Sequence, residues 1–195
     1  MAAFVLGNGV SRAAIDVDDL LRLGPVYGCN ALYRSHTVTA LVATDRPIAD
    51  VIQASGYSLQ HRFYTRRPQP GTGAQAVPRQ YFGFSSGPIA LALAAAENSG
   101  AAVYMLGFDM GPNQQGRFNN VFADTEHYKK SQAGPTFTGN WLRQMVTVMR
   151  DHPGCQFRRV HGATTADITE FASVPNLERV DIAEFLQRIN TAKDL

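Results

Sequence analysis

A-A-V-Y-M-L-G-F-D, residues 101–109, is the most strand-like stretch of this 195-residue chain. Six apolar residues are followed by glycine, phenylalanine and aspartate, which is typical of a buried strand that ends in a polar loop. The preceding stretch, 89–98, is nearly all alanine and leucine; Ser-Ser-Gly-Pro at 85–88 opens it and Gly100 closes it, which predicts a helix. A helix that leads directly into a buried strand indicates parallel βαβ organisation.

The same alternation continues along the rest of the chain. Short apolar runs predict strands at 2–6, 26–29, 40–44, 58–65, 156–160 and 177–181, and patterned or capped segments predict helices at 16–23, 47–52, 138–151 and 182–189. Strands that alternate with helices pair in parallel through right-handed crossovers. We therefore expect one α/β domain over residues 1–195, a three-layer Rossmann-like sandwich with a mainly parallel sheet.

Composition limits the classes of function. The formal net charge is +2, from 18 Lys+Arg and 16 Asp+Glu, so we expect no nucleic-acid partner. The longest apolar run, 89–96, falls short of the roughly 20 residues of a membrane span. Cys29 and Cys155 have no C-x-x-C spacing, which excludes a zinc finger and favours a reducing compartment. These features predict a cytoplasmic protein without a membrane span.

Two segments suggest irregular structure. A loop rich in proline and glycine covers 66–79, and four arginines lie in or beside it: Arg62, Arg66, Arg67 and Arg79. They predict either a solvated loop or a basic rim for an anionic ligand. Residues 110–135 show no sustained period, and loops of that length are typically functional or mobile. We interpret 110–135 as a lid loop.

Polar residues follow the predicted strands. Because ligands of parallel α/β sheets bind outside the carboxyl ends of the strands, these residues should meet at one edge. The residues expected there are Gly7, Asn8, Gly9, Ser11, Asn30, Asp45, Ser85, Ser86, Gly87 and Asp109.

Two loops of this set favour a phosphate-bearing ligand. Loop 7–11, G-N-G-V-S, follows a strand, and 85–87 opens a helix; both positions offer free backbone N–H groups to an anion. Neither is a standard nucleotide motif: Arg12 stands in place of the third glycine of G-x-G-x-x-G, and no P-loop is present. A tight turn at 7–9 and ordinary helix capping at 85–86 are the alternatives. Together, the loops suit a ligand with a phosphate and a sugar, such as a nucleotide.

The motifs and their order resemble those of a known family. They are G-N-G-x-S at 7–11, Y-G-C-N at 27–30, S-S-G at 85–87, V-Y-M-L-G-F-D at 103–109 and H-Y at 127–128. This order resembles the small bacterial sialyltransferases that use CMP-sialic acid, and the wider group of bacterial and phage proteins that share their nucleotide-binding core. The resemblance implies a nucleotide or nucleotide-sugar ligand, with CMP favoured, and metal-independent transfer of the sugar without a cofactor.

The resemblance also implies roles for five residues. Asn8 and Asn30 would contact the nucleotide and its phosphate, and Ser86 would lie on the CMP side. Tyr104 would stabilise the departing phosphate. His127 would be the general base, brought over the ligand by the lid loop; a surface histidine beside two lysines is the alternative reading of the residues themselves.

Departures from the family pattern keep two other functions open. Met110 stands where the family has a second tyrosine, and Lys129 follows the H-Y pair, which suits a nucleotide-binding module without catalysis. Some pterin-processing diphosphokinases also resemble this core, and Asp45 with Asp109 would offer oxygen ligands to Mg²⁺. The donor sugar, the acceptor and homo-oligomerisation through the alanine-rich helix stay open.

Overall fold

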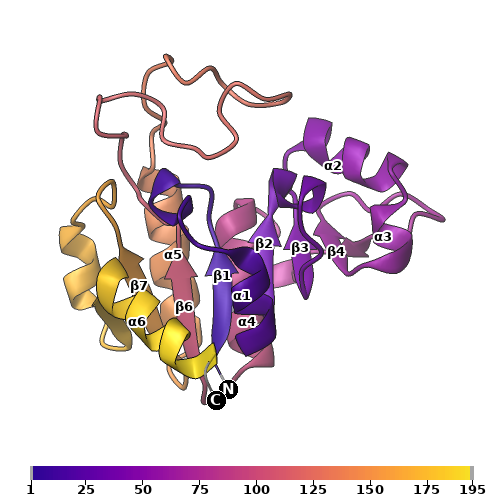
Figure 1. Ribbon diagram of the computed structural model, residues 1–195. Helices are drawn as coiled ribbons and strands as arrows, with labels where there is room; N and C mark the ends of the chain where they lie inside the picture. The colour runs from indigo at the N-terminus through magenta and orange to yellow at the C-terminus, as the bar shows by residue number, and fades with distance from the viewer. Residues whose placement is uncertain (1, 194–195) are drawn as a thin grey trace.

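The computed structural model describes residues 2–193, and over this range the chain forms an eight-stranded parallel sheet (Figure 1). The strands are β1 (Ala3–Leu6), β2 (Val26–Cys29), β3 (Ala40–Val42), β4 (Phe63–Thr65), β5 (Gln75–Ala76), β6 (Ala102–Leu106), β7 (Gln156–His161) and β8 (Leu177–Asp181). Their order in the sheet is β5-β4-β3-β2-β1-β6-β7-β8, and every neighbouring pair is parallel. The predicted α/β class is confirmed.

Helices cover both faces of this sheet. They are α1 (Val17–Leu23), α2 (Arg46–Ala54), α3 (Tyr57–Gln60), α4 (Ser86–Glu97), α5 (Gly139–Asp151) and α6 (Ile182–Lys193). Figure 1 shows α4 and α5 on one face and α1 and α6 on the other, so the three-layer Rossmann-like sandwich is confirmed. No helix among residues 2–193 has the length and apolar content needed to cross a bilayer.

The strands are buried on both faces. In β1, Ala3 and Val5 pack into the apolar cluster under α4 and α5, whereas Phe4 and Leu6 pack into the cluster under α1 and α6. This two-sided burial explains why the strands are continuous apolar runs rather than alternating ones. Helix α4 packs on β1, β2 and β3 and beside α5, and its alanines from Ala90 to Ala95 are buried within the chain. The alanine-rich helix is therefore part of the core.

The segment 58–65 differs from its prediction as one strand. Residues Tyr57–Gln60 form the single-turn helix α3, and only Phe63–Thr65 is extended. Gly56, which has a φ of +76°, ends α2 and redirects the chain into this extra turn. Within the predicted loop 66–79, Gln75–Ala76 adds the short edge strand β5. The turn at Gly56, rather than the weak apolar pattern of 58–65, thus determines the local structure of this segment.

Two of the four clustered arginines are engaged within the fold. Arg62 forms an ion pair with Glu97. Arg66 donates hydrogen bonds to the carbonyl oxygens of Phe82 and Phe84, at 2.8 and 2.7 Å, and so braces the turn that leads into α4. These bonds serve the fold rather than a basic rim.

Residues 110–135 contain no helix or strand and lie above the carboxyl edge of the sheet (Figure 1). Three sets of hydrogen bonds tie them to the core. The amide of Val121 donates to the carbonyl oxygen of Asn8 over 2.8 Å, and the amide of Ala31 donates to the hydroxyl of Tyr128 over 3.3 Å. Arg34 donates to the side chain of Thr125 and to the backbone that follows it. The lid loop is thus bonded down over the strand ends.

Candidate functional site

The site lies where the strand order reverses. From β1 the chain proceeds to β2 on one side, whereas β6 pairs with β1 on the other side and leads on to β7. Parallel sheets bind ligands at such a switch point, because the loops after the two central strands diverge and leave a crevice. Here the two loops touch: the amide of Gly9 donates to the carbonyl oxygen of Gly107 over 2.8 Å.

The glycines of the G-N-G loop are required by this contact. A Cβ atom at Gly7 would lie 2.5 Å from the carbonyl oxygen of Gly107, and one at Gly9 would collide with the carboxylate of Asp109. The loop leads into the three-residue 3₁₀ turn Val10–Arg12, and α1 begins only at Val17. The helix predicted at 16–23 is thus confirmed as α1, but a 3₁₀ turn separates it from the G-N-G loop.

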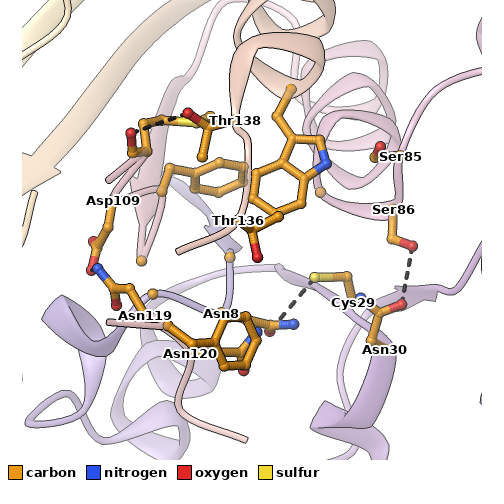
Figure 2. A pocket seen from close by; sticks show the side chains of 18 of the residues that line it. Asn8, Cys29, Asn30, Ser85, Ser86, Asp109, Asn119, Asn120, Thr136 and Thr138 are labelled. Atoms are coloured by element: carbon orange, nitrogen blue, oxygen red, sulfur yellow. Dashed lines mark hydrogen bonds between the residues drawn. The ribbon is translucent and has the colours of Figure 1, made fainter. Parts of the chain in front are cut away.

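A cavity of about 400 Å³ opens at this edge of the sheet, within the range of small-molecule sites (Figure 2). It brings together all the predicted site residues except Ser11 and Tyr104. Those that line it are Gly7, Asn8, Gly9, Asn30, Asp45, Ser85, Ser86, Gly87, Asp109 and His127.

Asn8 and Asn30 present their amide nitrogens to this cavity. The Cys29 thiol lies 3.7 Å from Oδ1 of Asn8, and the Ser86 hydroxyl donates to Oδ1 of Asn30 over 3.0 Å (Figure 2). Each carboxamide oxygen thus faces a protein donor, which sets the orientation of the group. Neither Nδ2 has a hydrogen-bond partner among residues 2–193. The pair offers two N–H donor groups to a ligand rich in acceptors.

Cys29 serves this arrangement as a neutral thiol. It is buried, and burial raises its pKa to about 12. A thiol with that pKa stays protonated at neutral pH, and its one hydrogen can be donated to Oδ1 of Asn8 or to the nearer carbonyl oxygen of Leu6, 3.5 Å away; it is a poor nucleophile.

The start of α4 forms the wall beside Asn30. The Ser86 hydroxyl accepts a hydrogen bond from the backbone N–H of Thr44 over 3.0 Å and donates one to Asn30. Its hydrogen is therefore already bonded within the protein and is not free for a ligand. The Ser85 side chain makes no capping bond. The capping alternative is therefore not realised, and the first-turn amides of Ser86 and Gly87 have no side-chain acceptor. Such an uncapped amino end attracts anions.

Asp109 is a brace between loops. Its carboxylate accepts the backbone N–H and the hydroxyl of Ser11, Nδ2 of Asn119 at 3.1 Å, and the hydroxyls of Thr164 and Thr165 at 2.7 and 3.3 Å. Both carboxylate oxygens are occupied, and the residue is 4% exposed. Ser11, predicted to contact a nucleotide, instead points at this carboxylate. The other partners of this carboxylate lie far from Ser11 in sequence, and no sequence motif predicts them: Asn119, Thr164 and Thr165.

Tyr104 does not reach the cavity. It lies in the middle of β6 on the face covered by α6, where its ring stacks on Phe4 with 5.8 Å between centroids. Its hydroxyl accepts a hydrogen bond from Arg158 over 2.8 Å. The role in stabilising a departing phosphate that the resemblance implied is therefore corrected: the alternation of side chains along β6 points Tyr104 into the core.

Arg12 is a buried cation that the sequence analysis missed as a site residue. Its Nε donates to the carbonyl oxygen of Gly7 over 2.5 Å, and its aliphatic stem packs against Gly107; both glycines line the cavity. Its Nη2 is buried without a hydrogen-bond partner among the described residues. Burial lowers its pKa, but a guanidinium remains charged. The carboxylate of Asp109 and the ring face of Phe122, 5.6 Å from Cζ, stabilise this charge in part, and of its buried nitrogens Nη2 alone is left without an acceptor in the described chain.

His127 and Tyr128 occupy the edge of the cavity that the lid loop supplies. Tyr128 anchors the loop: it packs on Phe122, with ring centroids 5.5 Å apart, and burial raises its pKa. His127 adopts a φ of +68° beside this anchor, and its Nε2 lies 3.7 Å from a carboxylate oxygen of Glu126. The loop thus holds an imidazole over the cavity, as a general base requires.

The carboxylates do not form a metal cluster. Asp45 lines the cavity and makes no capping hydrogen bond to α2, whereas the oxygens of Asp109 are engaged by other side chains. Within residues 2–193, no group of three or more His, Cys, Asp or Glu side chains is placed to hold a metal ion.

Comparisons with family models, curated proteins and solved structures found no match to this chain. The cavity's own residues are therefore the basis for assigning a function.

Proposed function

We propose that this protein binds a nucleotide-activated sugar in the cavity at the ends of β1, β2 and β6, with a CMP-sugar favoured. One observation carries the proposal: Asn8 and Asn30, each oriented by a protein donor, turn their N–H groups into the same cavity as the uncapped start of α4. Phosphate oxygens accept hydrogen bonds and never donate them when ionised. A set of convergent donors is what a phosphodiester needs.

Charge and size support the same ligand. The buried guanidinium of Arg12 packs against the loops that carry Gly7 and Gly107, and the amino end of α4 adds the positive end of its dipole. Asp45, which offers free carboxylate oxygens at the rim, suits the hydroxyls of a sugar. The cavity of about 400 Å³ is larger than a phosphate and leaves room for a nucleoside.

The proposed reaction is transfer of the sugar to an acceptor hydroxyl. His127 takes the proton from that hydroxyl, and the resulting oxygen nucleophile bonds to the anomeric carbon of the donor. The bond from that carbon to the phosphate oxygen breaks, and its electron pair leaves with the nucleoside monophosphate. The donors of Asn8, Asn30 and the α4 amides stabilise the charge that develops on the phosphate.

A second candidate is a nucleotide-binding module without catalysis. Tyr104 lies outside the cavity, and Met110 lines it where the family has a tyrosine, so both phenols of the family's leaving-group contact are missing from this position. A chain with this arrangement would keep the N–H donors that bind the nucleotide and lack the hydroxyl groups that stabilise the departing phosphate.

Calorimetric titration with CMP, UMP, AMP and GMP, with Mg²⁺ or with chelator, tests binding. We expect CMP to bind most tightly and to be indifferent to chelator. If none of these nucleotides binds, the proposal is overturned. Binding or activity that requires Mg²⁺ would instead favour the diphosphokinase alternative.

Release of CMP from CMP-sialic acid, with water as acceptor, tests catalysis. We expect His127→Ala to slow this release by about 10²–10⁴-fold while CMP affinity is unchanged, because the base acts on the acceptor. The matched control is His36→Ala, since His36 lies outside the cavity. CMP binding without any CMP release by the unmodified protein would establish the non-catalytic module.

A further inference from the structure

Aromatic residues form the part of the cavity that the donor groups leave free. The cavity is lined by four aromatic side chains: Phe108, Phe118, Tyr128 and Trp141. Aromatic rings bind planar groups through their faces, but only when those faces are uncovered. The neighbours of each ring therefore decide which one is open to a ligand.

Three of these four rings are occupied by the protein. Phe108 is 6% exposed and lies under the first turn of α4. The ring of Phe118 is covered by the ammonium group of Lys129, 5.8 Å from its centroid. Tyr128 packs on Phe122 and anchors the lid loop. Each of these three rings already contacts a group of the protein.

Trp141 differs from the other three. It lies in the first turn of α5, is half-buried, and lines the cavity. Across residues 2–193 it makes no ring contact, and its indole N–H has no hydrogen-bond partner. Met145, one turn later on the same side of α5, is fully buried and also lines the cavity. The indole N–H is not among the buried unpaired side-chain atoms of residues 2–193, so this edge of the ring is open to solvent and to a group that enters the cavity.

We propose that Trp141 is the stacking platform for the base of the bound nucleotide. This inference rests on the proposed function, since the donors of Asn8, Asn30 and α4 account for the phosphate and leave the base without a partner. An uncharged indole face suits a planar heterocycle better than it suits a phosphate. Because every base has a π-face, Trp141 supplies affinity and little choice between bases.

Trp141 is the single tryptophan of the chain, so intrinsic fluorescence reports on this ring alone. We expect CMP to quench the emission with the same Kd that calorimetry gives. Ribose 5-phosphate, which carries the phosphate and sugar without a base, should compete with CMP and leave the emission nearly unchanged.

Substitution measures the contribution to affinity. Trp141→Ala should weaken CMP binding by about 10-fold to 100-fold, and Trp141→Phe by much less, because a smaller aromatic ring still stacks. The control is Phe137→Ala: Phe137 precedes α5, is 74% exposed and does not line the cavity, so its loss should leave CMP affinity unchanged. Recovery of binding in Trp141→Phe also shows that the fold is intact.

Two results would overturn the inference and leave the proposed function standing. One is calorimetric CMP binding that neither changes the emission nor weakens in Trp141→Ala. The other is an equal loss of CMP and ribose 5-phosphate affinity in that variant, which would place the sugar, not the base, on the indole. Absence of binding by every nucleotide overturns both proposals together.

Discussion

The hydroxyl of Ser86, the first residue of α4, donates a hydrogen bond to Oδ1 of Asn30, the first residue after β2, over 3.0 Å. The bond joins two loops that lie 56 positions apart in sequence and sets which way the Asn30 carboxamide faces. Asn30 has a φ of +55°, a region that asparagine enters more readily than most residues. Both the side-chain hydrogen bond and the backbone conformation therefore favour asparagine at this position.

Replacement of Asn30 by aspartate should weaken CMP binding. Asn30→Asp keeps the shape but replaces the N–H donor with a negative oxygen that faces the phosphate. We expect a loss of at least about 1.5–3 kcal/mol, or more than about 10-fold in Kd, by calorimetry. Asn190→Asp, the same change on the exposed surface of α6, is the control and should leave the Kd unchanged. Equal effects of the two would mean that only net charge matters.

Adjacent serines should behave differently when each is changed to alanine. Ser86→Ala removes the acceptor of the buried Thr44 N–H and the donor to Asn30, and should lower the free energy of unfolding by about 1–3 kcal/mol. CMP affinity should fall with it, because Asn30 is no longer oriented. Ser85→Ala should change stability by less than about 0.5 kcal/mol. Urea unfolding measures both; indistinguishable variants would refute the positioning role of Ser86.

Removal of the charge of Arg12 should weaken CMP binding and leave the free energy of unfolding nearly unchanged. Arg12→Met keeps the volume and removes a buried guanidinium. The burial cost of that charge, with Nη2 unpaired, offsets the lost Nε–H bond to the carbonyl oxygen of Gly7, so the ligand-free protein should lose little stability. Binding of CMP should weaken about tenfold, and its dependence on salt concentration should flatten. Arg22→Met, on the exposed side of α1, serves as the control. Lost stability with unchanged CMP affinity would make Arg12 purely structural.

His161 should make the protein less stable in mild acid. Burial and the neighbouring Arg159 and Arg179 lower its pKa from 6.5 to about 4, although Asp167 and Asp181 oppose this. The unfolded chain then binds a proton between these pH values that the folded chain rejects. The free energy of unfolding therefore falls as the pH drops from about 6.5 to 4, by at most about 3 kcal/mol from this group.

Urea unfolding between pH 7 and pH 4 tests this dependence. His161→Gln should flatten the pH profile, because the carboxylates titrate alike in both proteins. A profile of the variant as steep as that of the unmodified protein would assign the acid sensitivity to other groups.

Most of the layout could be predicted from short apolar runs. Residues 3–6 and 102–106 are buried on both faces of a parallel sheet, and such strands are recognisable without any knowledge of their partners. Because parallel strands end at one edge, the placement of Asn8 and Asn30 at a common cavity followed from strand positions. Segment 58–65 was misjudged because its apolar pattern was weak and Gly56 imposed a turn.

Tertiary structure decided which polar side chains are available to a ligand. Asp109 and Ser11 are predicted ligand contacts, yet they bind each other and Thr164, which lies 55 positions away from Asp109. Tyr104 belongs to the core although its motif suggested the site. Arg12 is a buried cation without a full set of partners. Periodicity along the chain sets local structure and the edge where strands end, but hydrogen bonds between distant loops decide which polar groups stay free for a ligand.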